Sequence, residues 1–126
     1  MNSDLFSLLK LYNSLPEWEE VNLTSFDQQN GAGDQPIHVA AMRGKVDELE
    51  LLISSGASVD AKGEQGYTPL MYAIESGLLP AVEFLLSSGA NREALNEFEM
   101  NAIDLAAALD ETELVLVLTS WKKGQC

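Results

Sequence analysis

Few side chains in this sequence are of the types that carry out nucleophilic or metal chemistry. The chain has one histidine, His38, and one cysteine, Cys126. A zinc site of the usual kinds needs three or four Cys, His or carboxylate ligands, and a Ser–His–acid or Cys–His catalytic arrangement needs a histidine beside its nucleophile. The residues for neither arrangement are visible, so we expect no metal, no cofactor and no catalytic residue.

Carboxylates are plentiful and are the remaining candidates for catalysis. Acids gather, for example, at 47–50 and 110–113. General acid–base catalysis needs one carboxyl held in an apolar cleft with a shifted pKa. These acids fall where exposed helix faces or helix starts are expected. A solvated surface is therefore the better interpretation, and a carboxylate-based hydrolase is a remote alternative.

The glycine pair Gly31 and Gly33 lies in a polar loop, 27–34. A phosphate-binding loop would follow a strand and would carry a lysine followed by serine or threonine. Neither feature is present, and we expect no small-molecule substrate.

Net charge is the dominant feature of the composition. Twenty acids against seven bases give −13 on 126 residues. Such a chain repels nucleic acid and anionic membranes and attracts a basic protein, with faster association at low salt. Solubility alone is the alternative reason for the charge. The acids are also unevenly placed, because Glu93 to Trp121 contains seven acids and no base.

No targeting or membrane segment is expected from the sequence. No apolar run approaches the roughly 20 residues that span a bilayer. The first residues, MNSDLFSLLKLYNSL, lack a basic start and a small-residue cleavage site. With its single cysteine the chain forms no internal disulfide, which agrees with a reducing compartment. We expect a cytoplasmic protein.

The stretch 66–90 predicts two short helices placed back to back. Thr68 can cap the first helix, and Pro69 suits its first position, where a missing N–H costs nothing. Gly77 ends that helix, Pro80 opens the next, and Gly89 closes it as a left-handed residue. One such pair cannot bury its own apolar face, so it needs neighbours.

Proline and glycine landmarks of this stretch recur at one interval. The pairs that are 33 residues apart are Pro36 and Pro69, Gly44 and Gly77, Gly56 and Gly89, and Gly33 and Gly66. A period of 33 with two helices per repeat is typical of ankyrin arrays. With GYTPL at 66–70, IHVAA at 37–41 and SSGA at 54–57 and 87–90, the sequence resembles the ankyrin-repeat family over about 28–121.

The resemblance implies an all-α solenoid of stacked helix–turn–helix units with short hairpin-like loops, forming a single domain over 1–126. The expected divisions are N-terminal capping helices at 1–27, repeats at 28–60 and 61–93, and a degenerate C-terminal capping repeat at 94–126. It also implies that His38 braces its own helix against neighbouring backbone through its ring nitrogens.

The two ends depart from the repeat pattern. The N-terminal cap is expected to hold a helix at 4–14, which buries Leu5, Leu8, Leu9 and Tyr12 and is stopped by Pro16, and a second short helix at 18–23. In the first repeat we expect helices at 36–43 and 46–54, the latter burying Val46, Leu49, Leu52 and Ile53. In the last repeat Glu99, Ala102 and Asp110 replace glycine, proline and glycine, and a final helix at 111–121 seals the core.

In arrays of this kind the loop tips and the outer face of each first helix line a concave groove. The positions that map to the groove are Asp34, Met42, Arg43, Lys62, Glu64, Gln65, Tyr67, Glu75, Ser76, Leu95, Glu97, Phe98, Met100, Ala108 and Leu109. An aromatic and apolar centre with an acidic surround suits protein binding. The alternative is that Phe98, Met100 and Leu109 pack under the final helix.

These observations predict a non-catalytic protein-binding module, monomeric when unbound. Its most concrete form is an acidic inhibitor that resembles small immunity-type ankyrin proteins and covers a basic partner such as a nuclease toxin. A regulatory adaptor or assembly chaperone with a partner of ordinary charge is the alternative. Salt dependence separates the two, because charge steering fades as ions screen it.

Overall fold

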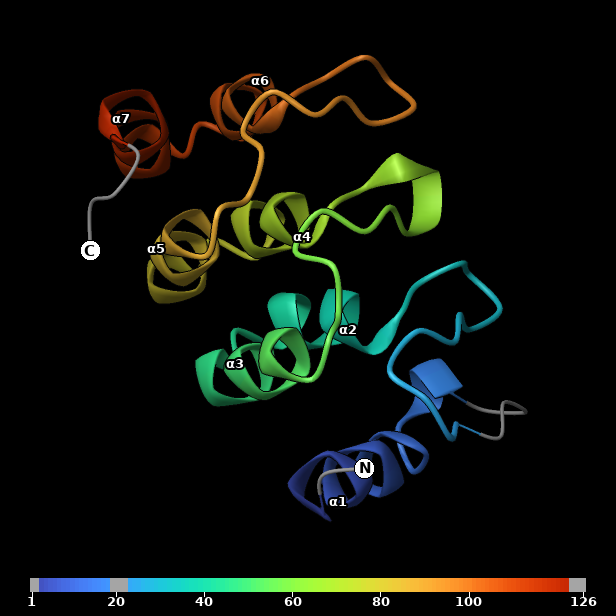
Figure 1. The fold of residues 1–126 in the computed structure, drawn as a ribbon. Helices are drawn as coiled ribbons and strands as arrows, with labels where there is room; N and C mark the ends of the chain where they lie inside the picture. The colour runs from blue at the N-terminus through green and yellow to red at the C-terminus, as the bar shows by residue number, and fades with distance from the viewer. Residues whose placement is uncertain (1–2, 19–22, 123–126) are drawn as a thin grey trace.

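The computed structural model describes residues 3–18 and 23–122 and contains only helices and loops there (Figure 1). The helices are α1 (Ser3–Tyr12), η1 (Pro16–Trp18), α2 (Pro36–Arg43), α3 (Val46–Ser54), η2 (Glu64–Gly66), α4 (Pro69–Glu75), α5 (Leu79–Ser87), α6 (Ala102–Ala108) and α7 (Thr112–Ser120), of which η1 and η2 are short 3-10 helices. In the described segments no helix is long and apolar enough to cross a membrane.

Three helix pairs, α2–α3, α4–α5 and α6–α7, stack in chain order (Figure 1). The first helices form one row, in which α4 packs between α2 and α6. The second helices form the other row, in which α5 packs between α3 and α7. The N-terminal helix α1 packs against α3, so it continues the second row.

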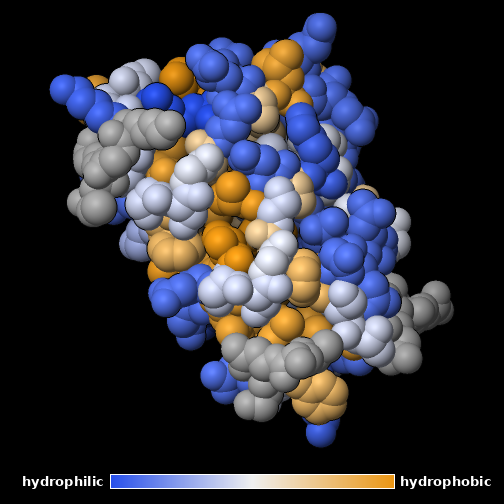
Figure 2. Space-filling model, viewed as in Figure 1, coloured by the Kyte–Doolittle hydropathy of each residue, from blue (hydrophilic) through white to orange (hydrophobic). Residues whose placement is uncertain are grey.

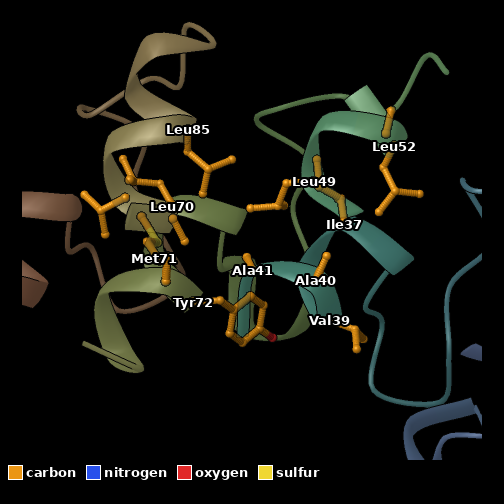
Figure 3. Close-up of a cluster of buried hydrophobic side chains, with 14 of the residues drawn as sticks. Ile37, Val39, Ala40, Ala41, Leu49, Leu52, Leu70, Met71, Tyr72 and Leu85 are labelled. Atoms are coloured by element: carbon orange, nitrogen blue, oxygen red, sulfur yellow. The ribbon is translucent and has the colours of Figure 1, made fainter. Parts of the chain in front are cut away.

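The core lies between the pairs. In Figure 3 the labelled side chains of α2 and α3 lie beside those of α4 and α5. Leu49, Leu52 and Leu85 are fully buried, as are Ile37 and Leu70 to within 1%. Burying each such side chain contributes about 1.5–3 kcal/mol. A helix pair without neighbours would lose most of this burial, which is why the units fold as a stack.

Proline, threonine and glycine set the helix boundaries as the sequence predicts. Pro36 and Pro69 occupy the first helical positions of α2 and α4. The Thr68 hydroxyl accepts a hydrogen bond from the Met71 N–H at 3.3 Å, so Thr68 caps α4. Gly77 follows α4 with φ +68°, the left-handed conformation that ends a helix.

The third pair keeps this backbone without the glycines. Glu99 has φ +60° where Gly66 has φ +75°, and Asp110 has φ +58° where Gly77 has φ +68°. A left-handed residue with a Cβ costs about 1–2 kcal/mol. The stack therefore imposes its loop geometry on residues that do not favour it.

At the N-terminal end, three details differ from the sequence prediction. Leu5, Leu8, Leu9 and Tyr12 are buried as expected. However, α1 ends at Tyr12, and Pro16 does not stop this helix but opens η1. Of the predicted helix at 18–23, Trp18 belongs to η1, Leu23 lies in a loop, and 19–22 lie outside the described residues.

In α3 the predicted buried stripe is narrower than expected. Leu49 and Leu52 are buried, whereas Val46 and Ile53 are only partly buried. This helix packs against α2 and also contacts α1 and α5.

The outer surface of the third pair is more polar than the surfaces between pairs. Met71 and Leu86 in the second pair are buried, at 1% and 5% exposure. The residues 33 positions later, Asp104 and Thr119, are exposed. The α6–α7 pair therefore has polar side chains on its exposed end surface, at positions where the α4–α5 pair has buried apolar ones.

Candidate functional site

Each helix pair is preceded by a loop that one backbone hydrogen bond closes. We name these loops finger 1 (29–34), finger 2 (62–67) and finger 3 (95–100). The closing bonds run from the N–H groups of Asn30, Gly63 and Asn96 to the carbonyl oxygens of Asp34, Tyr67 and Met100, at 2.8, 2.8 and 3.0 Å. The expected hairpin-like shape is therefore present, held by hydrogen bonds within each loop rather than by strands.

Fingers 1 and 3 share a side-chain brace that finger 2 lacks. Asn30 Oδ1 accepts the N–H groups two and four residues later at 2.9 and 3.0 Å, and Asn96 Oδ1 does the same at 2.8 and 3.1 Å. Finger 2 has Gly63 at this position, because a Cβ there would lie 2.3 Å from Asp34 Oδ1. The same Asp34 oxygen accepts the Glu64 N–H at 2.9 Å.

The prediction that Asp34 contacts a partner is wrong. Asp34 is only 3% exposed. Besides the Glu64 N–H, its Oδ1 accepts the Tyr72 hydroxyl at 2.7 Å. Burial, and then the Asp34 carboxylate, raise the pKa of Tyr72. Asp34 is a structural residue that joins finger 1 to finger 2 and to α4.

Arg43 is likewise engaged within the molecule. Its Nη1 lies 3.2 Å from Glu48 Oε1, and its guanidinium carbon lies 5.5 Å from the centre of the Tyr12 ring. The Tyr12 hydroxyl donates to the same Glu48 oxygen at 2.5 Å. Burial, and then the Glu48 carboxylate, raise the pKa of Tyr12. The predicted partner residue Arg43 thus links α2 to α1 and α3.

His38 has the bracing role that the resemblance implies. Its Nδ1 accepts the Gln35 N–H at 2.9 Å, so the ring proton is on Nε2, which donates to the Ala61 carbonyl oxygen at 2.7 Å. Burial lowers the pKa of His38 against the opposing effects of the Ala61 carbonyl and the Asp34 carboxylate. The ring fixes the start of α2 and the chain just before finger 2.

Finger 2 is tied to finger 3 by two contacts. The Lys62 ammonium donates to the Leu95 carbonyl oxygen, and the Glu97 N–H donates to the Gln65 carbonyl oxygen at 2.9 Å. Gln65 is itself left-handed, with φ +56°. The predicted partner residue Lys62 therefore already has an acceptor inside the protein.

No group of three or more His, Cys, Asp or Glu side chains within the described segments could hold a metal ion.

A family model described as ankyrin repeats (3 copies) matches residues 2–96, more than half of the chain. The chain belongs to the ankyrin-repeat family. No curated protein matches the sequence. The predicted fold, an all-α ankyrin solenoid, is confirmed, and ankyrin repeats are a protein-binding fold.

The remaining predicted groove positions of this ankyrin array divide by exposure. Those that are exposed are Glu64, Gln65, Glu75, Ser76, Leu95, Glu97, Phe98, Ala108 and Leu109, and those that are partly buried are Met42, Tyr67 and Met100. Tyr67 packs beside Tyr72, with ring centres 5.3 Å apart. Burial, and then the Glu75 carboxylate, raise the pKa of Tyr67.

Large apolar side chains reach the surface in and near finger 3. Phe98 is 55% exposed, Leu95 50% and Leu109 41%. They do not pack under α7, whereas Met100 does lie against the core. Figure 2 shows hydrophobic surface beside hydrophilic surface at the end of the molecule that α6 and finger 3 form. The alternative of a purely packing role therefore holds for Met100 only.

Sequence reasoning missed two candidates in the same region. Glu99 and Asp110 are exposed and left-handed. The signal was present, because glycine occupies the corresponding position in both earlier units. Both are among the seven acids of 93–121, a segment that contains no base.

Proposed function

We propose that this ankyrin-repeat protein is a non-catalytic, acidic inhibitor that binds a basic protein. The observation that carries the proposal is the exposure of Leu95, Phe98 and Leu109 inside 93–121, a segment with seven acids and no base. Exposed apolar side chains supply contact area, and a surround of one charge sign selects the partner and speeds encounter.

The partner we propose is a protein whose own working surface is positive. A toxin that cuts nucleic acid is the natural example, because its substrate groove must attract phosphate. An immunity-type protein would cover that groove and keep the substrate away. In this proposal the ankyrin protein is cytoplasmic and monomeric until it binds.

An adaptor or assembly chaperone with a partner of ordinary charge is the second candidate. The exposure of Phe98 and Leu95 favours it equally, because an apolar contact needs no charge on the partner. The two candidates differ in their response to ions, since screening at high salt weakens only the charge-steered encounter.

The test is to capture partners from a native lysate, identify those present in equal amount, and measure association rates between 0.05 and 0.5 M salt (about 14 to 4 Å of Debye length). We expect a basic partner, an association rate that falls at least about tenfold over this range, and loss of the partner's activity when it is bound. A stoichiometric partner with neutral or acidic charge and a flat salt response would refute the inhibitor proposal and support the adaptor.

A further inference from the structure

We infer that binding is concentrated at the C-terminal end of the array and that the occupant is a basic, partly apolar segment of the partner. This surface, which we name the C-terminal surface, consists of finger 3, the exposed side of α6 and the α6–α7 turn, 95–111. The inference rests on the proposed function, and it narrows the predicted binding surface from the whole groove to its last unit.

The first step is that three charged groups of the earlier units already have partners inside the protein. Asp34 is buried, Arg43 pairs with Glu48, and Lys62 donates to a backbone oxygen of finger 3. A partner at these positions would have to break internal bonds. In the first two units, Asp34, Arg43 and Lys62 therefore serve internal contacts, while Glu64 and Glu75 remain exposed.

The second step is the distribution of apolar exposure. Among the predicted groove positions, the large hydrophobic side chains that are exposed are Leu95, Phe98 and Leu109, all on the C-terminal surface. Their counterparts 33 residues earlier are the polar Lys62, Gln65 and Ser76, and 66 residues earlier they are Gln29, Ala32 and Arg43. A large apolar side chain therefore occurs at these positions only in the last unit.

The third step is the placement of acids in unfavourable backbone. Glu99 and Asp110 are left-handed where both earlier units have glycine. Glycine would be the more stable residue at both positions, so folding does not explain the acids. These two positions therefore carry carboxylates that the fold does not require.

Together these features specify the occupant. Between Glu99 and Asp110 lies α6, whose seven residues span about 10 Å, and its residues Asp104, Ala107 and Ala108 are exposed. A segment lying along α6 would meet carboxylates at both ends and apolar side chains between and beside them. Arginine or lysine flanking a leucine or aromatic residue is the complementary pattern.

The experiment uses a fluorescein-labelled, amidated twelve-residue peptide with six arginines and two leucines, and measures anisotropy with the full chain at low salt. The double variant Glu99→Gly/Asp110→Gly removes two charges and relieves the backbone, so it must still fold. The matched control is Glu50→Gln/Glu83→Gln, which removes two charges from exposed positions on α3 and α5. Melting is followed by circular dichroism for every variant.

We expect the glycine variant to weaken peptide binding about threefold to tenfold, and the control less than about twofold. Phe98→Ala should weaken it at least about fivefold. Glu99→Gln/Asp110→Asn, which keeps the side-chain size, should lose as much affinity as the glycine variant.

Equal losses in the control and the glycine variant, or unchanged binding by Phe98→Ala, would overturn the C-terminal surface while leaving a basic partner possible. A different result overturns the proposed function itself: wild type binding the arginine peptide no more tightly than a version with glutamate in place of arginine. The two failures are therefore distinguishable.

Discussion

Fingers 2 and 3 occupy equivalent positions in successive units and use them in opposite ways. Each is closed by one hydrogen bond between positions four residues apart, and each has a left-handed residue just before its end. In finger 2 the lysine reaches the next loop, and the tyrosine packs on Tyr72. In finger 3 Phe98 projects into solvent with more than half of its surface exposed.

The difference shows that the repeat fixes the position of a side chain but does not fix whether that side chain is exposed and able to contact a partner. Availability depends on the neighbouring unit. Finger 2 lies between two others and contacts both, since its Glu64 N–H donates to Asp34 on one side and its Lys62 ammonium donates to the Leu95 carbonyl oxygen on the other. Finger 3 receives contacts from finger 2 and is left with exposed side chains of its own.

The comparison assumes one core beneath both fingers, and Leu85→Asp tests that assumption with the largest expected effect. Leu85 is fully buried in α5, so an aspartate there leaves a charge without a partner between the units, and we expect a loss of at least about 4 kcal/mol in the free energy of unfolding. Leu116→Asp is the matched control, because Leu116 in α7 is 64% exposed. Its melting temperature should stay close to that of wild type in circular dichroism.

Asp34→Ala against Phe98→Ala contrasts a supporting side chain with a presented one. Asp34→Ala leaves the Glu64 N–H and the Tyr72 hydroxyl without their acceptor, and we expect a loss of about 2–4 kcal/mol in urea unfolding. Phe98→Ala should change stability by less than about 0.5 kcal/mol. Equal losses would mean that Phe98 belongs to the core, and the comparison would break.

The free energy of unfolding should depend on pH through His38, which braces the first helix pair. Because burial lowers the pKa of His38 in the folded state, the unfolded chain takes up the proton first as pH falls below about 6.5. Stability is then lost by up to about 1.4 kcal/mol per pH unit until the folded state also protonates. His38→Gln removes this slope, so the difference in unfolding free energy between wild type and variant should shrink from pH 7.5 to 5.5. Parallel curves would show that His38 does not titrate in this way.

Replacing the left-handed acids gives the smallest effect and has the opposite sign. Glu99→Gly and Asp110→Gly should each raise the unfolding free energy by about 0.5–1 kcal/mol, because glycine adopts positive φ without strain. Gly77→Ala is the reciprocal control. Its Cβ would meet Glu111 at an ordinary 3.5 Å, so its expected loss of about 1 kcal/mol comes from φ +68° alone. Destabilisation by either acid-to-glycine change would show that those carboxylates support the fold.

Features fixed by local chemistry were predictable from the sequence. Pro36, Pro69 and Gly77 gave helix bounds that the structure reproduces, because ring closure and positive φ act within one or two residues. The family match confirms the repeat class that their spacing predicted.

The candidate site was only partly predictable, because it depends on contacts across units. Asp34 bonds to groups 30 and 38 residues away, and Arg43 stacks on Tyr12 from another helix. The exposure of Phe98 depends on its neighbours in space, which the local sequence does not reveal. The sequence did contain one clue to the role of Asp34. Asn30 and Asn96 occupy equivalent positions in fingers 1 and 3, whereas finger 2 has Gly63 there, and the Asp34 carboxylate lies against Gly63.

The few hydrogen bonds that join one finger to the next have a mechanical consequence. Finger 2 is held to finger 1 through the Asp34 carboxylate, and finger 3 to finger 2 through the Gln65 and Leu95 carbonyl oxygens, with no sheet running through all three. Load applied along the stack passes through these links and through the apolar packing between neighbouring helix pairs, one interface after another. A chain pulled by its two ends would therefore peel away unit by unit, beginning at an end, and would record separate small force steps rather than one large rupture.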